Sequence, residues 1–84
     1  MRIDKFLKVS RLIKRRTVAN EACSGGRISI NGNTAKAGDK VKIGDEIEIR
    51  LGEKTLKVRV LAVEDHVGKD AASSLYEVLY DRTK

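Results

Sequence analysis

The sequence lacks several features on which extracellular, membrane and large catalytic proteins depend. Proline is absent, and the one cysteine, Cys23, has no second cysteine for an internal disulfide, which favours a reducing, cytoplasmic setting. No apolar run approaches the roughly 18 residues of a membrane span, and the N-terminus lacks the apolar core of a secretion signal, so we expect no membrane association. A chain of 84 residues has a thin core, which disfavours a deep active-site cavity.

Positive charge is distributed unevenly along the chain. The first 16 residues contain seven basic side chains and one acidic side chain, Asp4, so they carry the whole formal net charge of +6. Residues 17–84 contain equal numbers of basic and acidic side chains. A solvated helix face is the simpler explanation of such a run. Because the whole net positive charge lies in one short segment, however, a binding site for a polyanion is favoured. The seven basic residues are Arg2, Lys5, Lys8, Arg11, Lys14, Arg15 and Arg16.

Two short helices are expected in the N-terminal part. Residues 3–12 have one apolar stripe at about 100° per residue, and Val9 and Leu12 lie off that stripe, where they are free to contact a second element or a partner. A second helix is expected from about Arg16 to Ser24, followed by a left-handed cap at Gly25-Gly26. The first stripe consists of Ile3, Phe6, Leu7 and Ser10, and the second of Val18, Ala19, Ala22 and Cys23.

Beyond Gly26 the apolar period changes to two, which predicts strands. Asn31-Gly32 predicts a hairpin turn, and residues 64–74 form a polar connection with one helical turn at Ala71 and Ala72. These elements predict an α+β fold in which two helices pack on a small, twisted antiparallel sheet with a C-terminal strand extension. The expected strands cover residues 28–30, 34–36, 47–51, 54–63 and 75–80, and Val41 and Ile43 also alternate, before a bend at Gly44-Asp45.

The side chains that carry chemistry are few and scattered. Cys23 lies on an apolar stripe, which is typical of a small core residue, and His66 lies in a polar loop without a second histidine or a cysteine nearby. Ser10 has no base near it in the sequence, and no set of paired carboxylates stands out. We therefore expect neither catalysis, nor a metal site, nor a cofactor.

The break between the two expected helices brings Lys14, Arg15 and Arg16 to one corner. Arg2, Lys5 and Lys8 extend this corner along the first helix. The start of the second helix adds unpaired backbone N–H groups, which favour a phosphate. The corner lacks aromatic side chains, so base stacking is not the expected mode. Recognition of the backbone and shape of structured RNA, or of DNA, fits better. The candidate contacts are Arg2, Lys5, Lys8, Arg11, Lys14, Arg15, Arg16 and Lys36.

Four segments together resemble the S4 (S-four) RNA-binding domain, also called the alpha-L motif. They are residues 2–7, residues 14–17 with Ala19, residues 26–32 and residues 41–47. The resemblance covers about residues 1–50, and residues 51–84 would form a C-terminal β extension of the same single domain, 1–84. It implies two helices against a small sheet, with the helix corner on structured RNA.

Residues 1–17 are most similar to small stand-alone members of the S4 family. Those members bind the large ribosomal subunit carrying a stalled peptidyl-tRNA and support alanine tailing with an RqcH-type factor. The resemblance thus implies contacts to ribosomal RNA, to peptidyl-tRNA and to such a factor. We expect the chain to be a monomer. A heat-shock-type subunit-recycling or assembly factor is the alternative within the family. A DNA-binding protein and a module for an acidic protein partner are the alternatives outside it.

One departure from the S4 pattern concerns the start of the second helix. Many members have Ser or Thr as the cap before the arginine of that helix, whereas this chain has Arg15. Either the cap is lost, or the helix starts at Thr17. The departure adds a cation and leaves the electrostatic argument unchanged.

Overall fold

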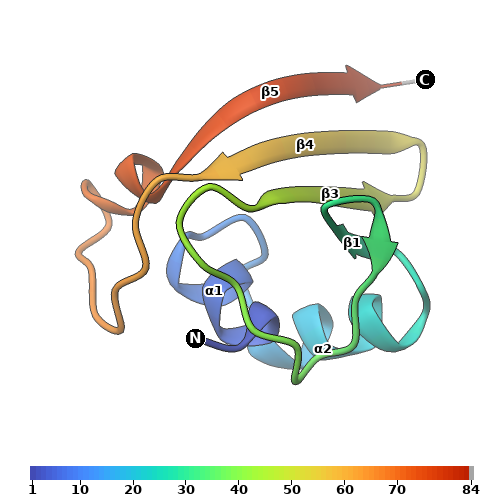
Figure 1. The fold of residues 1–84 in the computed structure, drawn as a ribbon, viewed down its shortest axis with the longest axis horizontal. Helices are drawn as coiled ribbons and strands as arrows, with labels where there is room; N and C mark the ends of the chain where they lie inside the picture. Colours follow the sequence, from blue (N-terminus) through green and yellow to red (C-terminus); the bar gives the residue numbers. More distant parts are fainter. Residues whose placement is uncertain (84) are drawn as a thin grey trace.

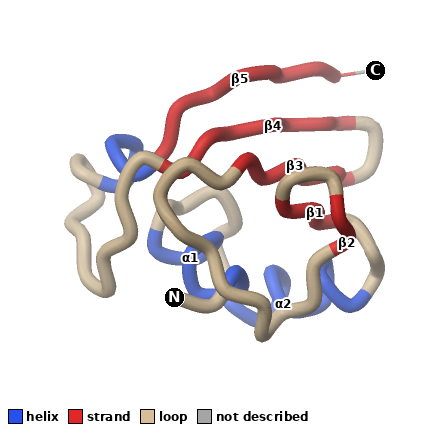
Figure 2. Tube along the Cα trace, viewed as in Figure 1, coloured by secondary structure: helices blue, strands red, loops and turns tan. Residues whose placement is uncertain are grey.

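The computed structural model describes residues 1–83 as two helices packed against one five-stranded sheet (Figures 1 and 2). The sheet is antiparallel throughout and has the strand order β2-β1-β3-β4-β5. In Figure 1 the helices lie below β1 and β3, and β5 is the strand farthest from them. The predicted α+β class, with two helices on a small sheet and a C-terminal strand, is confirmed.

Helix α1 (Ile3–Val9) is shorter than the expected 3–12. It ends because Arg11 adopts a left-handed conformation, with φ of 63°, and the backbone N–H of Ile13 then donates to the carbonyl of Leu7. This turn brings Ile13 into the core, where it is 5% exposed. Val9 and Leu12 pack partly buried against the core, so of the two predicted contacts, a second element or a partner, the structure shows the first.

Helix α2 (Arg16–Ser24) has the predicted bounds. It ends in a left-handed cap in which the N–H groups of Gly26 and Arg27 donate to the carbonyls of Cys23 and Ala22. Gly26 has φ of +73°, a conformation that glycine adopts without steric cost. The side chains of Ala19, Ala22 and Cys23 are buried as predicted, whereas Val18 is 41% exposed and does not belong to the apolar stripe.

The strands are β1 (Ile28–Ile30), β2 (Asn33–Thr34), β3 (Glu46–Leu51), β4 (Lys54–Val60) and β5 (Tyr76–Thr83). Strand β2 is shorter than the predicted 34–36 because Ala35 turns into the core and the backbone N–H of Lys36 bonds the Asp39 carboxylate. Strand β4 ends at Val60, three residues earlier than predicted. The segment predicted as a strand at 75–80 is a strand, β5, which begins at Tyr76 and extends to Thr83.

The segment from Ala35 to Asp45 is a loop, although Val41 and Ile43 alternate. The middle of its backbone pairs with the N-terminus, whereas its two ends bond strands β1 and β4. The N–H of Ile3 donates to Asp39 at 2.7 Å, and the N–H of Val41 donates to Met1 at 2.8 Å. Val41 is buried by this pairing, and Ile43 is 65% exposed. The loop therefore holds the backbone of Arg2 from both sides.

The connection between β4 and β5 contains one 3-10 turn, η1 (Ala72–Leu75), close to the helical turn expected at Ala71 and Ala72. Leu75 and Ala72 are buried, and Leu75 belongs to the hydrophobic core. The rest of the connection, residues 61–71, lies beside α1, because Asp65 forms an ion pair with Lys5 at 3.0 Å (Figure 1).

Candidate nucleic-acid interface

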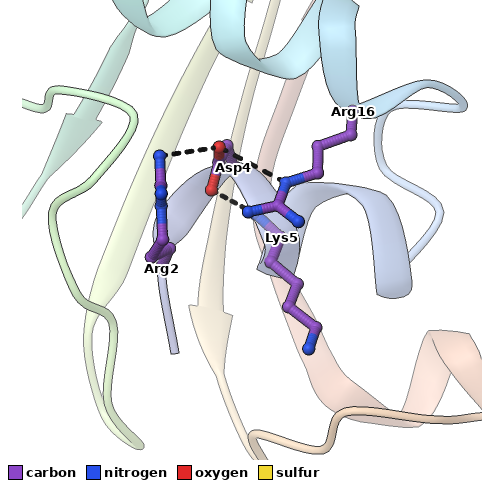
Figure 3. A network of polar contacts seen from close by, with 4 residues as sticks. All are labelled: Arg2, Asp4, Lys5 and Arg16. Atoms are coloured by element: carbon purple, nitrogen blue, oxygen red, sulfur yellow. Dashed lines mark hydrogen bonds and ion pairs between the residues drawn. The ribbon is translucent and has the colours of Figure 1, made fainter.

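A buried carboxylate, Asp4, lies between two arginines where the helices meet (Figure 3). Its Oδ2 accepts from a terminal nitrogen of Arg2 at 3.2 Å and from Nε of Arg16 at 3.4 Å. Its Oδ1 accepts from the backbone N–H of Lys5 at 2.8 Å. Both carboxylate oxygens are therefore occupied, and the side chain is 2% exposed. We call Arg2, Asp4 and Arg16 the arginine cluster.

Each member of the arginine cluster is placed by its helix terminus. Arg2 is the extended residue just before α1, Asp4 lies in the first turn of α1, and Arg16 is the first residue of α2. A carboxylate in the first turn is also favoured by the helix dipole. The packing of α1 on α2 brings the two helix starts together, so that one carboxylate serves arginines 14 residues apart.

The two arginines remain available to a ligand. Their side chains are 50% and 49% exposed, and each uses only one of its nitrogens on Asp4. A guanidinium carries five donors in a planar fork that matches phosphate oxygens. The carboxylate therefore holds the two guanidinium groups in place and leaves most of their donors facing solvent.

The start of α2 resolves the two alternatives left open by Arg15. The helix begins at Arg16, and Arg15 is its extended N-cap residue without a side-chain cap hydrogen bond. The cap is therefore lost. Nevertheless, the Arg15 carbonyl accepts the first helical bond from Ala19, so the helix register is regular.

The other predicted basic residues divide into three groups. Lys14 and Arg15 are exposed in the connection between the helices, beside the arginine cluster. Lys8 and Arg11 line a hollow at the end of α1, and Lys5 faces the same side through its ion pair with Asp65. Lys36 is exposed next to the C-terminal end of α2, where it lines a depression with Cys23 and Ser24. The structure thus does not bring Lys36 to the corner at which α2 starts.

Sequence reasoning missed two acidic residues. Asp4 organises the arginine cluster, and its signal was its position as the one acid among seven basic residues. Asp65 anchors the loop 61–71 on α1, and nothing in the local pattern points to it, because its partner lies 60 positions away. The Lys5 ammonium beside it holds the pKa of the Asp65 carboxyl below its usual range.

No group of His, Cys, Asp and Glu within residues 1–83 is arranged to hold a metal ion. Cys23 is buried, and burial, together with the nearby carboxylates of Asp4 and Asp39, raises the pKa of its thiol. A thiol in this setting stays protonated and unreactive. His66 is exposed, as predicted. None of the helices formed by these residues has the length and apolar character that crossing a membrane requires.

Comparison with known proteins connects these features to a family. The S4 domain matches residues 1–47, which contain both helices and the whole arginine cluster. The RQC P-site tRNA stabilizing factor of Halalkalibacterium halodurans is 62% identical over 93% of this chain and 89% of its own length. The factor of the same name from Bacillus subtilis is 56% identical over 94% of this chain and 92% of its own length.

A solved structure shows the same fold. The trimeric structure of Vibrio cholerae Heat Shock Protein 15 superposes with a TM-score of 0.86 at 32% identity, covering 93% of this chain and 80% of that chain. The likeness extends well beyond the helices and therefore includes the strands after residue 47. On the match over residues 1–47 and the identity to full-length relatives, the chain belongs to the S4 domain family.

Proposed function

We propose that this chain is a non-catalytic RNA-binding factor of ribosome-associated quality control. It binds the ribosomal RNA of the large subunit together with peptidyl-tRNA, and it holds the tRNA there while the stalled nascent chain is extended with alanine. The arginine cluster carries the proposal, because a buried carboxylate presents two half-exposed guanidinium groups side by side. The names of the most similar relatives, which refer to the P-site tRNA, support the same role.

The mechanism is electrostatic and needs no chemical step. Guanidinium and ammonium groups donate charge-assisted hydrogen bonds to phosphate oxygens, and counterions released from the RNA add to the affinity. A compact basic corner that contacts two RNA backbones slows the departure of either. We propose as RNA contacts Arg2, Lys5, Lys8, Arg11, Lys14, Arg15, Arg16 and Lys36.

The assembly follows from the same proposal. The factor acts in the cytoplasm as a monomer, and an RqcH-type tailing factor recruits the alanyl-tRNA. Sedimentation equilibrium of the purified chain tests the monomer directly. A trimer, the state named for the Vibrio cholerae structure, would contradict it.

The decisive experiment measures tail synthesis on purified, stalled large subunits with the tailing factor present. Tails should shorten when this chain is omitted, and a double variant, Arg2→Ala with Arg16→Ala, should not restore them. Lys54→Gln, an exposed cation on the β3–β4 hairpin, removes charge elsewhere and should restore them fully. An excess of duplex DNA should not compete with the subunits.

Binding should also depend steeply on salt. If about five phosphates are contacted, log affinity should fall with log salt at a slope of roughly −3.5 to −4.5. A heat-shock-type subunit-recycling factor is the second candidate, supported by the likeness to Heat Shock Protein 15. Equal tailing with the wild type, with the double variant and without the chain would refute the tailing role and favour recycling.

A further inference from the structure

A second basic site lies at the other end of α1 from Asp4. The last residues of α1 and the loop 61–71 enclose an open hollow of about 320 Å³, lined by Lys8, Val9, Arg11, Asp65, His66, Val67 and Gly68. A volume at the low end of ligand pockets, roughly 300–1,000 Å³, suits a small charged group better than a large apolar ligand. No lining residue is aromatic, so a base has no ring on which to stack.

The charges around this hollow are predominantly positive. Lys8 and Arg11 are exposed and border it, and neither forms an ion pair within residues 1–83. Asp65, the one acid in the lining, is paired with Lys5 at 3.0 Å. His66 adds an exposed imidazole from the loop. An anion entering the hollow therefore meets two uncompensated cations and one further donor.

Arg11 occupies a backbone position that arginine does not favour. Its φ of 63° lies in the left-handed region, where the turn after a helix usually has glycine because a Cβ is strained there. A strained residue that the fold retains is a reason to look for a role of its side chain. The left-handed turn places Arg11 in the lining of the hollow, together with the loop residues 65–68.

We propose that this hollow binds a backbone phosphate of RNA and is a contact point separate from the arginine cluster. The inference rests on the RNA binding proposed above and extends it beyond the S4 domain, because His66 and its loop lie outside residues 1–47. Lys8 and Arg11 supply the charge. The loop, which the ion pair between Lys5 and Asp65 joins to α1, adds His66 to the lining.

Two variants test the site on purified large ribosomal subunits at one fixed salt concentration. Arg11→Gly should raise the midpoint of thermal unfolding by about 2–5 °C, since strain is relieved, and weaken binding about tenfold, since a charged donor is lost. His66→Glu should weaken binding at least as much, and His66→Lys should bind as well as the wild type. Lys54→Gln is the control for the loss of one charge.

The outcomes separate this inference from the proposed function. Normal binding by Arg11→Gly and His66→Glu, with binding lost in the Arg2 and Arg16 double variant, overturns the second site alone. Normal binding by all of them overturns the proposed function. A lower unfolding midpoint in Arg11→Gly overturns the strain argument. If Arg11→Gly and His66→Glu bind deproteinised large-subunit RNA normally but no longer bind intact subunits, the hollow binds an acidic protein segment and the inference is wrong.

Discussion

The substitution Asp4→Asn tests whether the buried carboxylate orients the two arginines or merely neutralises them. The substitution keeps the size of the side chain and removes its charge, so the formal net charge rises from +6 to +7. Simple electrostatics then predicts tighter RNA binding. At about 10 Å in water one added charge is worth about 0.4 kcal/mol for each phosphate, and salt screens part of it.

The loss of orientation acts in the opposite direction and is larger. An amide keeps one acceptor oxygen, so it cannot hold the Lys5 N–H and both guanidinium groups as the carboxylate does. Ordering a freed long side chain on the RNA costs about 0.5–1.5 kcal/mol, and two arginines are freed. We therefore expect binding to weaken by about 1–2 kcal/mol, which is roughly five- to thirty-fold.

The stability of the fold should fall as well. The arginines are half exposed, so each ion pair contributes at most about 1 kcal/mol, and we expect a total loss of about 1–2 kcal/mol. For a domain of this size that corresponds to a decrease in the unfolding midpoint of about 5–15 °C.

The assay for Asp4→Asn combines thermal unfolding with co-sedimentation on large subunits, at a temperature well below the midpoint of the variant. Lys54→Gln again controls for charge. If Asp4→Asn stays folded and binds as tightly as the wild type, or more tightly, Asp4 only neutralises its neighbours and the orientation argument is refuted.

Three further predictions concern the rest of the chain. Cys23→Ala should lower the free energy of unfolding by about 1 kcal/mol and leave ribosome binding intact. In the wild type, the Cys23 thiol should resist alkylation until the protein unfolds, and fast alkylation of the native state would contradict its burial. Asn31→Ala should destabilise the fold by about 2–3 kcal/mol in urea titration, because the Asn31 side chain bonds the buried Asp45 carboxylate and the Glu46 N–H. Asn31 also has a left-handed backbone conformation, which strains an alanine. Asn33→Ala on the exposed strand β2 is the control and should have little effect. Lys57 and Arg59 lower the pKa of Glu46, so the contribution of the Glu46 carboxylate to stability is present above the unfolded pKa and is lost as pH falls through the lower, folded pKa. Glu46→Gln should therefore lower the unfolding midpoint near pH 7 and have no effect near pH 2. An equal effect at both pH values would rule out the ion pairs as the cause.

Local patterns determined most of the elements. The period of 3.6 residues, followed by the period of two, predicted both helices and the places of the strands along the chain, and Gly25-Gly26 predicted the end of α2 to the residue. These features depend on neighbours a few positions apart, and local sequence is sufficient for them. The concentration of charge in residues 1–16 likewise needs only the order of residues, and it predicted a basic corner.

Only the tertiary structure decided how that corner is organised. Asp4 and Arg16 are 12 positions apart, Lys5 and Asp65 are 60 apart, and Arg2 is held by the loop that contains Asp39 and Val41. Such pairings depend on how the chain packs, and no local period encodes them. The left-handed turn at Arg11 shows the same limit: the apolar stripe predicts a helix to residue 12, but burying Ile13 in the core ends it at Val9.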